Sequence, residues 1–209
     1  MTLTNIITKK FILSEVYDEI ILKYLEEGED RMNSANNTTK NFFFRTGGAK
    51  ELGAWKWLPS YQFRALIAEF VFSDRKGIDF GGLFGPIYGN TVIVDIHRAH
   101  GGIKFLKDIK DEDLDYIFSS HTLEHVFNLR DELSEMYRVL KKKGNILFIV
   151  PAYTCVRWRH GILESHLRTF SLEGDKWTRI DKEVEKVGFK LYAVRYCWDN
   201  SIFLFGEKL

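Results

Sequence analysis

The sequence has few cysteines and prolines and lacks any long uninterrupted apolar run. Cys155 and Cys197 do not have the spacing of a metal motif and do not suggest a disulfide framework, so we expect both thiols to be reduced. Charged residues interrupt the apolar stretches between residues 6 and 25, which argues against a signal peptide. No apolar run approaches the roughly 20 residues that cross a bilayer. These absences predict a cytoplasmic protein without a membrane partner.

An excess of charge of one sign is also lacking. Thirty Lys and Arg residues stand against 29 Asp and Glu residues, for a formal net charge of +1. This balance gives no electrostatic reason to expect general nucleic-acid binding. The 45% hydrophobic and 28% charged fractions are typical of a globular protein, and 209 residues fit one domain with a small appended element.

The pattern of apolar residues divides the chain into two parts. Residues 1–70 contain apolar residues at helical spacing, from Leu13 to Tyr24 and again after Ser60, which predicts a helical extension or lid. Residues 71–209 alternate short β-branched runs with helical patterns. We predict strands at residues 77–80, 91–96, 103–106, 114–119, 146–150, 189–196 and 202–205, and helices at 129–140, ended by Gly144, and from Trp177 to Val187, ended by Gly188.

This alternation predicts an α/β fold with a doubly wound, mostly parallel, Rossmann-like sheet of about seven strands. Only a few residues around Asp199 join the last two strands, too few for a crossover, so this hairpin should be antiparallel. A ligand of such a sheet lies outside the carboxyl ends of its central strands.

A glycine turn follows the first of these strands. Gly81, Gly82 and Gly85 would let backbone amides approach a ligand closely, and Asp95 ends the next strand, where a carboxylate can accept ribose hydroxyls. Only nine residues separate Gly85 from Asp95, too few for the full helix that holds a pyrophosphate. The spacing therefore favours a nucleoside cofactor without phosphate, such as S-adenosylmethionine (SAM), over NAD. A tight turn without a ligand is the alternative.

From about residue 76 onward these motifs resemble the class I SAM-dependent methyltransferases. The run Asp79–Gly85 is similar to that family's Asp-x-Gly-x-Gly-x-Gly signature. Asp95 is similar to its ribose-binding acid, and Asp108 to a position that often contacts adenine. The run Leu114–Val126 is similar to its fourth strand and following turn. The resemblance implies that SAM is the cofactor and that these residues bind it: Asp79, Gly81, Gly82, Gly85, Asp95, Asp108 and Ser120.

One residue departs from the family signature. Leu83 replaces the middle glycine, which leaves open a degenerate SAM-binding domain with a structural or regulatory role. A nucleotide-dependent oxidoreductase is a further alternative.

The residues after the predicted fourth strand suggest the chemistry. Methyl transfer to a hydroxyl needs an aligned nucleophile and a base. His121 and His125 are our candidate catalytic residues, since His121 lies at the rim and a neutral imidazole is available near neutral pH. With Glu124 they stand at i, i+3 and i+4, a spacing that could hold a divalent cation. We prefer local pairing of Glu124 and His125 and assign no metal.

The loop over residues 151–168 is rich in Arg and also contains Trp158 and His160. An aromatic side chain among cations suits a sugar, an acid or a phosphorylated metabolite. The resulting prediction is O-methylation of a small hydroxylated metabolite, such as a sugar or sugar nucleotide. The sequence leaves the oligomeric state open.

Overall fold

The computed structural model describes residues 74–82, 91–94, 105–155, 165–197 and 200–209. The predicted extension over residues 1–70 lies outside the described residues, so the division into two parts stays a prediction. None of the helices in the described part of the chain combines the length and apolar character that a membrane span requires.

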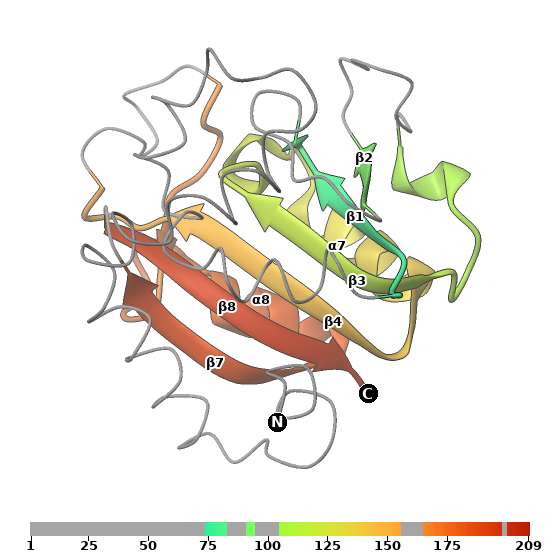
Figure 1. The fold of residues 1–209 in the computed structure, drawn as a ribbon. Coiled ribbons are helices and arrows are strands. Elements are labelled where there is room, and N and C mark those ends of the chain that lie inside the picture. Colours follow the sequence, from blue (N-terminus) through green and yellow to red (C-terminus); the bar gives the residue numbers. More distant parts are fainter. Residues whose placement is uncertain (1–73, 83–90, 95–104, 156–164, 198–199) are drawn as a thin grey trace, which may run out of the picture.

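The described residues form a six-stranded sheet in the order β2-β1-β3-β4-β8-β7 (Figure 1). Strands β1 to β4 pair in parallel, whereas β8 runs antiparallel to both β4 and β7. The strands are β1 (Gly77–Phe80), β2 (Thr91–Val94), β3 (Leu114–Ser120), β4 (Leu140–Pro151), β7 (Phe189–Cys197) and β8 (Ser201–Lys208). The expected mostly parallel Rossmann-like sheet and its antiparallel hairpin are therefore confirmed.

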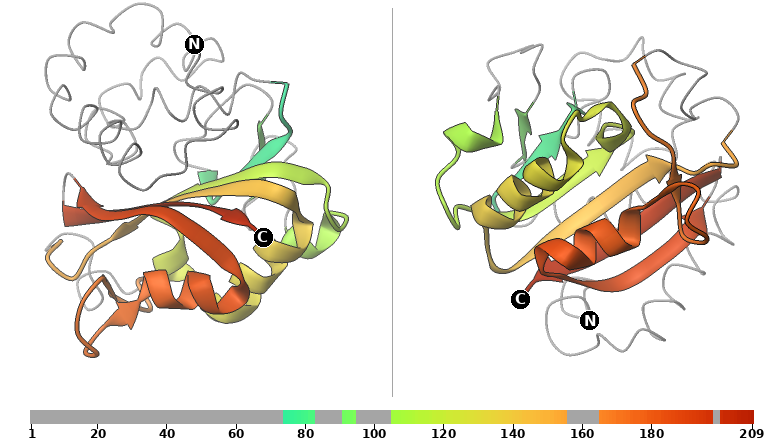
Figure 2. Two further views of the ribbon diagram at one scale, coloured as in Figure 1. Left: turned by 90° about the horizontal axis from the view of Figure 1, so that it is seen from below. Right: turned by 180° about the vertical axis from the view of Figure 1, so that it is seen from behind.

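The two α-helices of the described residues cover the same face of this sheet (Figure 2). They are α7 (Leu129–Val139) and α8 (Ile180–Val187). Asn128 caps α7 by accepting a hydrogen bond from the backbone N–H of Asp131, as its residue type predicts. Gly188 ends α8 with a left-handed φ of 115°. Buried apolar side chains of both helices pack against the sheet and include Leu133, Met136, Val139, Ile180 and Val184.

Several predicted boundaries differ from the structure. Helix α7 ends at Val139, one residue before its predicted end, and β4 begins at Leu140 instead of residue 146, because fully buried Leu140 turns into an extended conformation and pairs with Leu114. Trp177 precedes α8, since β6 (Thr178–Arg179) pairs with β5 (Phe170–Ser171) before the helix begins.

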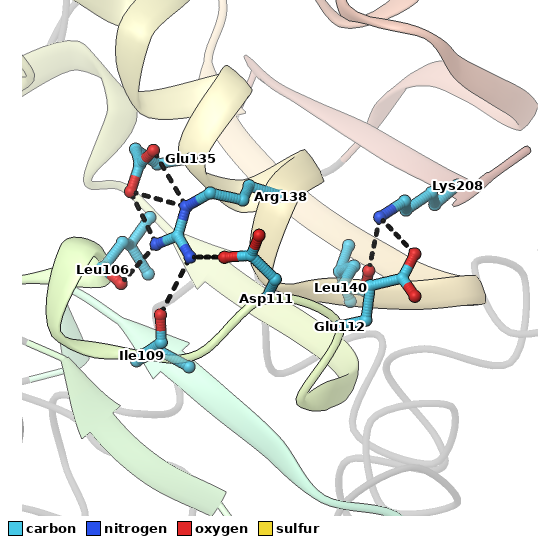
Figure 3. A network of polar contacts seen from close by, with 8 residues as sticks. All are labelled: Leu106, Ile109, Asp111, Glu112, Glu135, Arg138, Leu140 and Lys208. Carbon is cyan, nitrogen blue, oxygen red and sulfur yellow. Dashed lines mark hydrogen bonds and ion pairs between the residues drawn. The ribbon is translucent and has the colours of Figure 1, made fainter.

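The third predicted strand, residues 103–106, lies partly outside the described residues. Its last residue begins the 3₁₀ helix η3 (Leu106–Asp108). Arg138 on α7 donates to the carbonyls of Leu106 at 3.2 Å and Ile109 at 3.0 Å (Figure 3). A side chain thus satisfies carbonyls that a strand would pair with a neighbouring strand. The same figure shows Lys208 donating to the carbonyl of Leu140 at 2.8 Å, which fastens the end of β8 to the start of β4.

Candidate functional site

The turns that follow β1 and β3 pack against each other at the carboxyl edge of the parallel strands. Gly81 has a φ of 82°, and a β-carbon at this position would collide with the side chain of Thr122. Its backbone N–H donates to the carbonyl of Val94, the last residue of β2, at 2.8 Å. The hydroxyl of Ser119 donates to the carbonyl of Phe80 at 3.1 Å. The ends of three neighbouring strands therefore form one bonded rim.

Asp79 directs its carboxylate toward the glycine turn. The residue lies on β1 with 2% of its surface exposed. A β-carbon on Gly82 would overlap the carboxylate of Asp79, so this position has room only for glycine. The turn thus has a buried carboxyl group directly behind its backbone.

Of the other predicted cofactor residues, the structure places only some near the glycine turn. Ser120 is the last residue of β3, and its carbonyl accepts a hydrogen bond from the Thr122 hydroxyl at 3.2 Å. Asp108 is exposed in η3. Gly85 and Asp95 lie outside the described residues. The structure therefore brings Ser120 to the same rim as the glycine turn and leaves Asp108 on a separate element.

His121 follows β3 in a left-handed conformation, with a φ of 51°. Its ring Nε2 lies 3.2 Å from the hydroxyl of Ser201 on β8. Burial, followed by the nearby His166 and His125, lowers the pKa of His121 to about 4. The imidazole is therefore neutral at physiological pH.

Glu124 lies in the 3₁₀ helix η4 (Leu123–His125) and is fully buried. Within the described residues neither of its carboxylate oxygens has a hydrogen-bond partner. Its Oε1 is 3.6 Å from His121 Nδ1 and 3.9 Å from His125 Nε2. Burial raises the pKa of this carboxyl to about 8. Buried His166 packs edge-on against His125, with 4.5 Å between the ring centres.

Comparison with known proteins finds a family match within part of the chain. Residues 90–148, which include β2, β3 and α7, match the family model for a methyltransferase domain. The chain carries a class I SAM-dependent methyltransferase domain. SAM is therefore the methyl donor. No curated protein shows significant sequence similarity to the chain.

Two solved structures share the fold of this methyltransferase. A SAM-dependent methyltransferase from Archaeoglobus fulgidus matches with a TM-score of 0.53 and 16% identity, over 79% of this chain and 100% of that one. A phosphoethanolamine N-methyltransferase from Haemonchus contortus matches with a TM-score of 0.51 and 15% identity, over 83% of this chain and 61% of that one. At these identities the similarity concerns the fold alone.

Three residues of the rim were not among the predicted site residues of the methyltransferase. Thr122 contacts the glycine turn, Ser201 bonds His121, and His166 joins the cluster around Glu124. The position of Ser201 could have been inferred, because the first residue of an antiparallel strand lies at the edge where the parallel strands end. The contacts of Thr122 and His166 have no comparable local signal.

A polar cavity of about 700 Å³ lies beside the connection between η4 and α7. Its walls include Phe127, Trp177, Arg130 and Arg179. Arg168 also lines it and donates to the carbonyls of Leu123 at 3.3 Å and Phe127 at 2.9 Å. The other basic and aromatic residues predicted for the 151–168 loop, at positions 157–160, lie outside the described residues.

Proposed function

We propose that this methyltransferase transfers the methyl group of SAM to a hydroxyl oxygen of a small hydroxylated metabolite, such as a sugar or sugar nucleotide. The supporting observation is the neutral imidazole of His121 at the carboxyl edge of β3. The next residue in the chain, Thr122, packs on the glycine turn. His121 is therefore adjacent in sequence to a residue that contacts the proposed cofactor site. A hydroxyl must lose its proton as it attacks the methyl carbon, and a neutral imidazole can accept that proton.

Glu124 would strengthen this base. An imidazole with a pKa of about 4 is a weak proton acceptor on its own. In its ionised form the carboxylate of Glu124, 3.6 Å from Nδ1, would stabilise the imidazolium once it forms. The acceptor hydroxyl would replace the Ser201 hydroxyl at Nε2. His125 would take part through its contact with the same carboxylate.

The proposed SAM site combines the rim residues with the two acids of the family signature. The turn and Ser120 would surround the methionine part of SAM, Asp95 would accept the ribose hydroxyls, and Asp108 would contact the adenine. The contact between Gly81 and Thr122 and the position of Asp79 behind Gly82 support a turn shaped for close ligand approach. The full proposed set is Asp79, Gly81, Gly82, Gly85, Asp95, Asp108 and Ser120.

Two further observations concern the acceptor. Aromatic side chains and arginines line the 700 Å³ cavity together with the acids Asp131, Asp175 and Glu183, and such polar surroundings suit a sugar. The structural neighbour from Haemonchus contortus is described as acting on phosphoethanolamine nitrogen, so amines form the second acceptor class to test.

The proposal is tested with a panel of sugars, sugar nucleotides and amines, followed by release of S-adenosylhomocysteine. With an accepted hydroxyl substrate, His121→Ala should lower turnover about 10²–10⁴-fold and leave SAM affinity nearly unchanged. Lys182→Ala, which removes an exposed side chain of α8 paired with Glu185, is the control and should leave turnover unchanged.

Three outcomes would contradict parts of this proposal. Full activity of His121→Ala would remove His121 as the base. Methylation of amines alone would replace oxygen by nitrogen as the acceptor atom. SAM binding without methylation of any acceptor in the panel would favour the degenerate-domain alternative that Leu83 suggests.

A further inference from the structure

A carboxylate and two imidazoles converge beside the rim. One ligand atom each of Glu124, His125 and His166 can be chosen so that all lie within 4.8 Å of one another. We propose that these three side chains bind a divalent transition-metal ion such as Zn²⁺. The set differs from the three residues that sequence spacing suggested, because His166, 41 residues beyond His125, takes the place of His121.

The carboxylate of Glu124 is the strongest reason for an ion. It is fully buried, and neither oxygen has a hydrogen-bond partner within the described residues. Proteins rarely bury an ionisable group without a partner, since removing it from water is costly. A bound dication would supply the missing partner.

His125 already has the orientation of a metal ligand. Its Nδ1 lies 3.0 Å from the carbonyl of Ser165. When Nδ1 carries the proton and donates it to this carbonyl, Nε2 is left with a lone pair. That Nε2 is 3.9 Å from Glu124 Oε1. Metal-binding histidines commonly donate their second ring nitrogen to a backbone carbonyl in this manner.

The distances fit an ion after small side-chain movements. Zinc binds His nitrogen and carboxylate oxygen at about 2.0–2.2 Å, so two ligand atoms of a tetrahedral site lie about 3.3 Å apart. The separation of 3.9 Å between His125 Nε2 and Glu124 Oε1, and the 4.8 Å limit for the whole set, exceed this value modestly. Side-chain rotation closes such gaps without moving the backbone.

The donor types select the class of ion. Two imidazoles with one carboxylate suit Zn²⁺ and Fe²⁺, whereas Mg²⁺ and Ca²⁺ prefer oxygen ligands alone. His121 keeps its contact with Ser201 and is not counted as a ligand, which leaves one coordination position open.

The ion would join two segments that are distant in sequence. Glu124 and His125 lie in η4, and His166 precedes β5. One backbone bond, from Leu167 N–H to the Glu124 carbonyl at 2.9 Å, already links these segments. Bound metal should therefore stabilise the fold, because it binds the native arrangement and not the unfolded chain.

The test is a calorimetric titration of the chelator-treated full chain with ZnCl₂ at pH 7.5. About one ion should bind per chain, with a rise in melting temperature. Glu124→Gln and His166→Asn should each weaken binding by more than about tenfold and abolish the rise in melting temperature. Glu185→Gln, which alters an exposed carboxylate paired with Lys182, is the matched control and should bind like the wild type.

The controls separate loss of the site from loss of the fold. Metal-free Glu124→Gln should melt no lower than the metal-free wild type, since the substitution removes a buried ionisable group that has no hydrogen-bond partner in the described residues. If Glu124→Gln or His166→Asn fails to fold, His125→Gln replaces it, because the His125 side chain is 39% exposed. Absence of Zn²⁺ binding by the wild type would overturn the proposal. Equal Zn²⁺ affinity in the folded variants, or equally tight binding of Mg²⁺, would do the same.

Discussion

Arg138 offers a direct measure of how firmly η3 is attached to α7. Its guanidinium donates to the carbonyls of Leu106 and Ile109 and pairs with the carboxylates of Glu135 and Asp111 (Figure 3). These two carboxylates raise the pKa of Arg138 above its ordinary value. Arg138→Met keeps most of the aliphatic stem and removes all of these polar contacts.

The expected loss of stability comes mainly from the two backbone carbonyls. Each partly buried bond from a charged donor contributes about 1–1.5 kcal/mol. The ion pairs add little, because the Asp111 side chain is 74% exposed and exposed pairs are weak. Arg138→Met should therefore lower the free energy of unfolding by about 2–3 kcal/mol, or the melting temperature by roughly 4–12 °C. SAM affinity should also fall, since η3 carries Asp108.

Urea denaturation followed by circular dichroism measures the stability, and calorimetry measures SAM binding. Arg130→Met is the matched control: the Arg130 side chain is 60% exposed and pairs only with Glu183 in the described part of the chain. Its loss should lower stability by less than about 1 kcal/mol. If Arg138→Met and Arg130→Met are equally stable, the two carbonyl bonds do not hold η3. Unchanged SAM affinity in a destabilised Arg138→Met would separate η3 from the cofactor site.

Two further predictions concern the rim. Gly81→Ala should destabilise the protein more than Gly174→Ala, because both glycines have positive φ (82° and 63°) but only a β-carbon at Gly81 meets a neighbour, Thr122. The left-handed backbone alone costs about 1–2 kcal/mol, so equal losses in urea denaturation would show that the Thr122 contact is unimportant. For His121, burial lowers the pKa from 6.5 to about 4. In this pH range the unfolded chain takes up a proton that the folded imidazole excludes, so in metal-free buffer the contribution of His121 to stability should decrease as pH falls from 6.5 toward 4, whereas the raised pKa of Glu124 acts in the opposite direction. The stability difference between the wild type and His121→Asn should therefore change across this range, and a difference that is independent of pH would contradict the assignment.

Local sequence patterns were sufficient to predict several elements of the fold. Strand β1 over Gly77–Phe80 and the start of helix α7 at Leu129 agree with the predicted boundaries. Each depends on signals within a few residues: a glycine turn after β1, and a capping Asn128 before an apolar stripe. The antiparallel hairpin of β7 and β8 followed from the short connection between them.

Predicted boundaries were wrong where a contact with a residue distant in sequence determines the local conformation. The apolar run predicted a strand only from residue 146, yet β4 begins at Leu140, which pairs with Leu114. Residue 106 continued an apolar run typical of a strand, yet Arg138, 32 residues away, takes its carbonyl. The pattern of apolar residues in either segment gives no information about partners that lie so far away in the sequence.

The candidate site also has features that the sequence predicts and features that only the structure shows. The sequence was sufficient to predict a glycine turn with its aspartate at the carboxyl edge of the sheet, because motif and topology are both read along the chain. Only the tertiary structure shows that His121 faces Ser201, that Glu124 is buried without a hydrogen-bond partner in the described residues, and that His166 packs against His125. These contacts join η4 to β8 and to the segment before β5, and burial of a charge depends on every element that surrounds it. Sequence spacing determines which residues can share one element, whereas the packing of separate elements decides which side chains meet.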